Sequence, residues 1–99
     1  MKYSFDWDPA KETANLRKHG VSFRRAATVF HDPQQLSVFD QEHSQQENRW
    51  ITLGIDNSGI VQVVIHTFEQ DSDSLCRIRI ISARKATRAE ILQYQESEG

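Results

Sequence analysis

The stretch Leu75–Glu90, LCRIRIISARKATRAE, joins a strand pattern, a run of cationic residues and a helix start. Ile78 and Ile80 alternate with two arginines, which predicts a strand with apolar side chains on one face and guanidinium groups on the other. Thr87 and Glu90 then form a T-x-x-E capping box, the signature of a helix N-terminus. Guanidinium groups held on a strand beside a helix N-terminus are well placed to bind phosphate oxygens, so this stretch is the first candidate for a functional site.

Length and composition predict one small domain spanning residues 1–99. The chain has 99 residues, of which 37% are hydrophobic, enough for a single core. It has no apolar run long enough to cross a bilayer, and its first seven residues lack the apolar segment of a secretory signal. Cys76 is the single cysteine, which excludes an internal disulfide and suits a reducing compartment. We therefore expect a cytoplasmic protein without membrane contact.

Charge alone does not predict a nucleic-acid-binding protein. The formal net charge is −2, whereas such domains are usually plainly basic. The charges are nevertheless segregated, with basic residues gathered at 11–25 and 77–88 and acidic residues at 40–47 and 69–73. A surface divided in this way can steer an anion to one face and a cationic partner to another.

The first third of the chain predicts a short strand followed by two helices. The strand is expected at Tyr3–Trp7, and a helix follows Asp8, which is a good N-cap, and ends at Gly20 in the left-handed conformation. Ser22 caps a second helix, which Asp32–Pro33 ends. The apolar face of this second helix has the spacing i, i+3, i+4 and i+7 and consists of Phe23, Ala26, Ala27 and Phe30.

The rest of the chain predicts an antiparallel sheet and a final helix. The expected strands are Leu36–Phe39, Arg49–Ile55, Ile60–Phe68 and Leu75–Ala83. A turn at 56–59 joins the second and third of these strands, an acidic loop at 69–74 precedes the fourth, and the helix runs from Thr87 to about Gln95. The predicted fold is therefore α+β in the order β-α-α-β-β-β-β-α, with the helical hairpin covering one sheet face.

Alternation along the strands predicts which side chains share a face. The face toward the helices is expected to hold Ile51, Leu53, Ile55, Val61, Val63, Ile65, Ile78 and Ile80. The opposite, open face is expected to gather Trp50, Thr52, His66, Arg77 and Arg79. Such a surface can stack a base and hold a phosphodiester. Its apolar members Trp50, Val64 and Phe68 also predict a partner that covers it.

Five blocks of sequence, spread over almost the whole length, occur in an order shared with one protein family. They are Phe5–Pro9, Asn15–Phe23, Ala26–Phe30 with Asp32–Pro33, Glu47–Trp50 with Gly54, and Arg79–Thr87. In these blocks the chain resembles the BrnT ribonuclease toxins of type II toxin–antitoxin systems. The resemblance implies a RelE-like fold and RNA cleavage without a metal, which inhibits translation and growth. It also implies neutralisation by a DNA-binding BrnA-like antitoxin in a toxin–antitoxin heterotetramer that binds operator DNA through the antitoxin and represses its own operon.

Metal-independent RNA cleavage uses the neighbouring 2′-hydroxyl as nucleophile and requires a base, an acid and cations around the phosphorus. Arginine suits the last role because it presents fixed donors to phosphate and stays protonated. Histidine or glutamate can move the protons. The predicted catalytic residues are Arg79, Arg84, Arg49, Glu47 and His43, and the predicted substrate-binding residues are Trp50, His66, Arg77, Lys85 and Arg88. No metal or cofactor is expected, because the histidines and the cysteine lack metal-ligand spacing.

Each of these assignments has a structural alternative. A strand arginine can instead pair with Glu69 or Asp71, Glu47 can orient Arg49 rather than act as a base, and Tyr94 suits packing better than catalysis. For the whole chain, the alternative to a ribonuclease is a non-catalytic module that binds a partner and acts as corepressor. A metalloenzyme, whose activity a chelator would abolish, is the weakest hypothesis.

Overall fold

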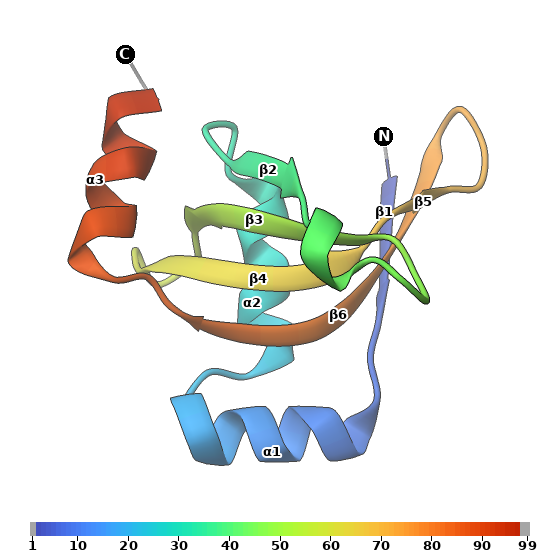
Figure 1. The fold of residues 1–99 in the computed structure, drawn as a ribbon, viewed down its shortest axis with the longest axis horizontal. Helices are drawn as coiled ribbons and strands as arrows, with labels where there is room; N and C mark the ends of the chain where they lie inside the picture. Colours follow the sequence, from blue (N-terminus) through green and yellow to red (C-terminus); the bar gives the residue numbers. More distant parts are fainter. Residues whose placement is uncertain (1, 98–99) are drawn as a thin grey trace.

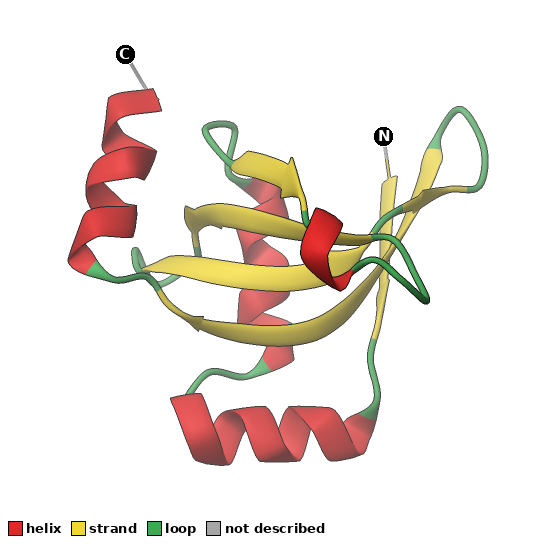
Figure 2. Cartoon of the chain, viewed as in Figure 1, coloured by secondary structure: helices red, strands yellow, loops and turns green. Residues whose placement is uncertain are grey.

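The computed structural model describes residues 2–97 and shows an α+β domain whose sheet carries helices on both sides (Figures 1 and 2). The elements are β1 (Lys2–Asp6), α1 (Pro9–His19), α2 (Phe23–Ala27), the 3₁₀ helix η1 (Thr28–His31), β2 (Leu36–Phe39), the 3₁₀ helix η2 (Gln41–His43), β3 (Arg49–Ile55), β4 (Val61–Thr67), β5 (Glu69–Gln70), β6 (Leu75–Lys85) and α3 (Arg88–Ser97). The predicted fold class and element order are confirmed. None of the described helices is long and apolar enough to span a membrane.

The sheet has the strand order β1-β6-β4-β3-β2, and the short β5 pairs with the start of β6. The pairs β2–β3, β3–β4 and β4–β6 are antiparallel, as expected. The pair β1–β6 is parallel, with Asp6 opposite Arg79, so the sheet is mixed rather than antiparallel throughout. The stretch expected to be an acidic loop at 69–74 begins with β5, because Glu69 and Gln70 pair with Arg77 and Cys76 of β6.

The predicted signals for the helix ends are confirmed. The Asp8 side chain accepts a hydrogen bond from the Ala10 amide (2.9 Å), and α1 ends at Gly20, whose φ of 70° lies in the left-handed region that glycine adopts without strain. Ser22 Oγ accepts from the Arg25 amide (3.1 Å) at the start of α2. These caps fix where the chain turns, so α1 and α2 leave the linker between them in different directions (Figure 1).

The two helices do not cover the sheet together. In Figure 1, α2 runs behind β3, β4 and β6, whereas α1 lies below them, beside β6. The buried Asn15 side chain fixes α1 there: its Nδ2 donates to the Ala83 carbonyl (2.9 Å) and its Oδ1 accepts from the Ala83 amide (3.0 Å). The amide thus takes the place of a neighbouring strand along the part of β6 that β1 does not reach.

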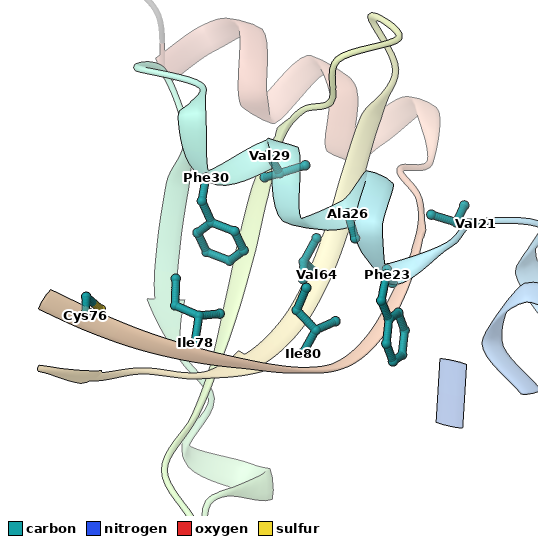
Figure 3. Close-up of a cluster of buried hydrophobic side chains, with 10 residues drawn as sticks. Val21, Phe23, Ala26, Val29, Phe30, Val64, Cys76, Ile78 and Ile80 are labelled. Atoms are coloured by element: carbon teal, nitrogen blue, oxygen red, sulfur yellow. The ribbon is translucent and has the colours of Figure 1, made fainter. Parts of the chain in front are cut away.

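The main core lies between α2, η1 and the sheet. Figure 3 shows Phe30 pointing from η1 toward Ile78 of β6, with Val64 and Ile80 beside them. The buried residues of this core are Val21, Phe23, Ala26, Val29, Phe30, Val64, Cys76, Ile78, Ile80 and Ala83. A second, smaller cluster of Leu53, Val63 and Tyr94 lies where α3 meets the other face of the sheet.

The predicted facing of β3 and β4 is wrong. The side chains of Thr52 and His66 are buried in the face that α2 and η1 cover, together with Val64. Leu53 and Val63, expected against the helical hairpin, lie on the opposite face beneath α3. Both faces of these strands are partly apolar and partly covered, so alternation alone could not decide which one α2 covers.

A β-bulge changes the facing within β6. Ile65 pairs with Ser82 and the next residue of β4, His66, pairs with Ile80, so Ile81 is the extra residue. Because of this insertion, Arg84 lies on the same sheet face as Arg79, although the two are five positions apart. Ile78 and Ile80 remain in the core, as predicted.

Candidate functional site

On the face opposite α2, a row of polar side chains crosses the sheet where β4 ends. Arg49 of β3 pairs with Thr67 of β4, and Thr67 Oγ1 accepts a hydrogen bond from the Arg79 amide of β6 (3.3 Å). Arg79 in turn pairs with Asp6 of β1. Four strands therefore each contribute one residue to the row, and residue pairing within a sheet puts these side chains on one face.

Three residues of this row, Thr67, Arg79 and Asp6, border a pocket of about 450 Å³, here called the arginine pocket. It is lined by Asp6, Glu47, Asn48, Thr67, Phe68, Glu69, Arg77 and Arg79. A second hollow of about 230 Å³ is lined by Glu42, His43, Gln45, Gln46, Glu47 and Arg49. Glu47 borders both, so the two hollows are neighbours. The fold thus brings together Arg49, Arg77, Arg79, Glu47 and His43, half of the residues predicted from the sequence.

Arg77 and Arg79 of the pocket, and Arg49 of the adjoining hollow, form partly exposed ion pairs with carboxylates. Arg79 Nη1 lies 3.6 Å from Asp6 Oδ2, and both side chains are at least half exposed. Arg77 Nε lies 2.9 Å from Asp71 Oδ2, the pairing foreseen as the structural alternative for a strand arginine. Glu47 lies 3.4 Å from Arg49, also as foreseen. Exposed pairs of this kind contribute only ~0–1 kcal/mol, so an anionic ligand can displace the carboxylates.

Arg84, near the end of β6, is held quite differently. Its two terminal nitrogens donate to the two carboxylate oxygens of Glu90, at 2.8 and 2.9 Å. Glu90 also accepts from the Thr87 amide (2.8 Å), which confirms the predicted capping box. The guanidinium and the capping bonds together lower the pKa of Glu90 to about 2, and the same pair raises the pKa of Arg84. Arg84 is therefore tied to the start of α3.

Three predicted site residues thus lie away from the arginine pocket. Arg84 is five residues along β6 from Arg79, roughly 15 Å at the usual rise of a strand. Lys85 follows it and borders a different groove, against α3, and Arg88 is the first residue of that helix. The structure does not bring these three residues to the other predicted catalytic groups.

His66 and Trp50 lie on the opposite side of the sheet from the arginines. His66 is buried, and burial lowers its pKa to about 4, so the ring is neutral near pH 7. Its Nδ1 lies 2.9 Å from the Thr67 carbonyl and its Nε2 2.6 Å from Thr52 Oγ1. Enclosed and fully engaged, His66 is not placed to exchange protons with a phosphodiester in the arginine pocket. His43, by contrast, is exposed, with Nδ1 2.9 Å from Asp40.

Some lining residues escaped prediction from the sequence. Asp6 enters the pocket only because β1 pairs in parallel with β6, and no local pattern encodes that pairing. Alternation gives Thr67, the last residue of β4, no role, and it assigns Phe68 only to the surface that a partner covers. Asn48 had one signal, since it lies inside the sequence block that includes Glu47 and Arg49. Tyr94, in contrast, is buried and donates a hydrogen bond to Asp32, as the packing alternative foresaw.

The geometry defines a class of site. A small α+β domain presents two arginines and a glutamate around a polar pocket, with a third arginine in the adjoining hollow. This combination is suited to binding a phosphodiester and moving a proton beside it. Among residues 2–97 no group of three histidine, cysteine or acidic side chains is arranged to hold a metal ion.

Comparison with known proteins identifies the family. Residues 7–90 match the family model described as the ribonuclease toxin, BrnT, of type II toxin–antitoxin systems. The chain therefore belongs to the BrnT family, and the resemblance inferred from its sequence blocks is confirmed. A search of curated proteins gave no match.

A solved structure agrees with this assignment at the level of the fold. The crystal structure of the Brucella abortus ribonuclease toxin BrnT is similar to the chain with a TM-score of 0.59 and 20% sequence identity. The alignment covers 89% of this chain and 100% of that one. At this identity the likeness concerns the fold alone.

Proposed function

We propose that this BrnT-family toxin is a metal-independent endoribonuclease whose active site is the arginine pocket with the adjoining hollow at His43. The observation that carries the proposal is the row of Arg49, Thr67 and Arg79 on three adjacent strands, next to Glu47. Arginines fixed on a sheet present donors to phosphate with little loss of side-chain freedom. Their positions follow from strand pairing, so they are set before substrate binds.

The proposed reaction needs only the RNA and these side chains. The ribose 2′-oxygen attacks the adjacent phosphorus, a 2′-O–P bond forms, and the bond from phosphorus to the 5′-oxygen breaks. Glu47 takes the 2′-hydroxyl proton and His43 supplies one to the leaving 5′-oxygen. The products are a 2′,3′-cyclic phosphate and a 5′-hydroxyl. The charge that gathers on the phosphoryl oxygens is stabilised by Arg79 and Arg49, with Arg77 holding the next phosphate.

The carboxylates around the pocket set a condition on substrate binding. The pocket is of mixed charge rather than strongly cationic, because its lining includes Asp6, Glu47 and Glu69. A phosphate that enters must replace Asp6 as the partner of Arg79, and the 3.6 Å separation and exposure of that pair make the exchange inexpensive. Arg84 is excluded from the catalytic group in this proposal because its two-point pair with Glu90 holds it elsewhere.

The proposal includes the partner that family membership implies. A DNA-binding BrnA-like antitoxin would neutralise the toxin in the cytoplasm, assemble with it as a heterotetramer and, on operator DNA, repress their operon. Exposed apolar side chains on the edge strand β2, Val38 at 58% and Phe39 at 41%, support a covering partner. Val64, expected earlier to belong to that contact surface, is fully buried and does not contribute.

The decisive experiment incubates purified protein with RNA in excess EDTA and analyses the product ends. Cleavage by the wild type with 2′,3′-cyclic phosphate ends, and its loss in Arg79→Ala, is the expected result. Leu92→Ala, which truncates an exposed apolar residue of α3, is the matched control and should cleave normally. Cleavage only after Mg²⁺ is restored would overturn metal independence. No cleavage under any condition would favour the non-catalytic binding module.

A further inference from the structure

A second pocket, here called the aromatic pocket, lies on the α2 side of the sheet and has a different chemistry. It encloses about 180 Å³ and its walls include Tyr3, Phe30, Trp50 and Phe68, with Ser37 and His66 at its polar end. Drug-sized ligands usually occupy pockets of ~300–1,000 Å³, so this one suits a single planar ring system. The catalytic steps proposed above do not use it.

The two pockets share a wall. Phe68 follows directly after β4 and borders both the arginine pocket and the aromatic pocket. Thr67, one residue earlier, links the two sides: its hydroxyl accepts from the Arg79 amide and its carbonyl accepts from the His66 ring. A ligand that has an anionic group joined through a short linker to a flat ring could therefore occupy both pockets around Phe68. A nucleotide within an RNA strand has this shape.

The aromatic walls are held in place by one another. Trp50 contacts Phe39 edge-to-face, with ring centroids 5.4 Å apart, and Phe68 at 6.4 Å. Phe30 meets His66 edge-to-face at 4.8 Å. Rings fixed in this way lose little freedom when a base stacks on them, and unstacked RNA bases bind to such aromatic surfaces.

The polar end of the pocket offers a hydrogen-bond acceptor. His66 Nδ1 faces a carbonyl and so must carry the ring proton, which leaves Nε2 to accept from Thr52 Oγ1 at 2.6 Å. With its proton committed to His66, the Thr52 hydroxyl can only accept from Ser37 Oγ, 2.7 Å away. Ser37 Oγ is then left with lone pairs and no proton to donate to a ligand. Because the lowered pKa of His66 keeps the ring neutral, this polarity holds near pH 7.

We infer that the aromatic pocket is a nucleobase subsite, in which the base next to the phosphate held by Arg79 packs against the Trp50 and Phe68 rings and donates an N–H to Ser37 Oγ. This inference rests on the proposed function for the position of the phosphate, and it assigns the source of base preference. A base that presents an amino or imino hydrogen to Ser37 satisfies the acceptor. A base edge that offers only acceptors there leaves lone pairs facing each other.

The test measures binding without cleavage, so that it is independent of the catalytic proposal. The probe is a single-stranded 2′-O-methyl RNA, which lacks the attacking hydroxyl, and the control probe has the same backbone with abasic sites. The protein carries Trp7→Phe, which leaves Trp50 as the single tryptophan. We expect the base-containing strand to quench Trp50 fluorescence and the abasic strand to bind without quenching. Equal quenching by both strands, or none by either, would overturn the subsite.

Variants then separate the two walls from the acceptor. Phe68→Ala should weaken binding of the base-containing strand by about tenfold, since one base–aromatic stack is worth that much, and should weaken binding of the abasic strand much less. Leu92→Ala, an exposed apolar residue outside the pocket, is the control. Ser37→Ala should flatten the preference among homopolymer probes rather than lower affinity overall. An unchanged affinity in Phe68→Ala would contradict the inference.

Failure of this inference and failure of the proposed function give different results. If base-dependent quenching is observed while the wild type cleaves no RNA, the subsite stands and catalysis is wrong. If Arg79-dependent cleavage is observed without base-dependent quenching, catalysis stands and the subsite is wrong. If Trp50 fluorescence responds only to a bound antitoxin and not to RNA, the pocket is a protein contact. That result would likewise overturn the inference.

Discussion

Two arginines of β6 lie on the same face of the sheet in opposite electrostatic surroundings. Near the middle of the strand, Arg79 has one exposed carboxylate at 3.6 Å and borders a pocket. Near the end, Arg84 makes two bonds to Glu90, at 2.8 and 2.9 Å, within the capping box of α3. The same residue type is thus an available cation at position 79 and a structural tie at position 84. The two arginines differ in how many of their guanidinium N–H donors are already bonded to a carboxylate.

The largest expected effect concerns Arg79, the available cation. Arg79→Ala should lower the rate of RNA cleavage by ~10²–10³-fold, the usual cost of removing one donor to a transition-state charge. Its thermal midpoint should stay within about 2 °C of the wild type, because the pair with Asp6 is exposed. Single-turnover cleavage and thermal unfolding by circular dichroism measure the two quantities. A variant that lost stability and activity together would make Arg79 a structural residue as well.

The next effect tests how firmly α1 holds the last part of β6. Asn15→Ala should destabilise the protein by about 2–3 kcal/mol, because the buried amide and carbonyl of Ala83 lose their partners. Chemical denaturation measures the loss, and Asn57→Ala, at an exposed turn, is the matched control. Residual activity of the folded fraction should be near that of the wild type. A loss below 0.5 kcal/mol, or an effect of Asn57→Ala of the same size, would show that the end of β6 does not depend on α1.

A smaller effect, with a defined pH dependence, comes from Arg84 and Glu90. The folded-state pKa of Glu90, about 2, lies below its ordinary 4.5, so its stabilising contribution is complete above about pH 4.5 and is lost as the pH falls toward 2. Since Arg84 is 42% exposed, solvent screening limits the pair to about 1 kcal/mol. Arg84→Ala should therefore be about 1 kcal/mol less stable at pH 7, and the gap should close near pH 2.

The same variant sharpens the contrast with Arg79. Arg84→Ala should retain RNA cleavage within about threefold of the wild type, since the pair with Glu90 already engages both terminal nitrogens of Arg84. Urea unfolding between pH 2 and 7 and cleavage at pH 7 are the measurements. A 100-fold loss of cleavage in Arg84→Ala, with stability unchanged, would reverse the assignment of the two arginines.

The smallest effect concerns Asp6. Asp6→Asn removes the carboxylate that competes with phosphate for Arg79, so KM for RNA should fall by about two- to threefold while stability changes by less than ~0.5 kcal/mol. Steady-state cleavage at low and high salt is the measurement, and the gain should shrink as salt screens the charges. A rise in KM would mean that Asp6 positions Arg79 rather than competing for it.

The local features of this fold could be predicted because their causes are local. Asp8, Gly20 and Ser22 cap helices through bonds to residues within four positions, and Thr87 and Glu90 do the same for α3. The bounds of β2 and β3 followed from runs of apolar and β-branched residues, whereas β5 was not foreseen. The pairing of Glu47 with Arg49, two positions apart, could be foreseen for the same reason.

The site could be predicted only in part, because face and neighbourhood are set by distant residues. His66 and Trp50 were placed with the arginines by alternation, yet α2 covers the face they occupy, and the bond from Thr52 makes burial of the His66 ring tolerable. The bulge at Ile81 put Arg84 on the arginine face, but Glu90 then held it away from the pocket.

The sequence by itself determined the elements, their caps, the family and the residue types available for phosphate chemistry, since each of these depends on near neighbours or on residue identity. The tertiary structure decided which of those residues meet. It did so through strand pairing between segments as distant as Asp6 and Arg79, through the choice of sheet face that α2 covers, and through competition among carboxylates for each guanidinium. Those outcomes depend on free energies summed over the whole fold, and no short stretch of sequence contains them.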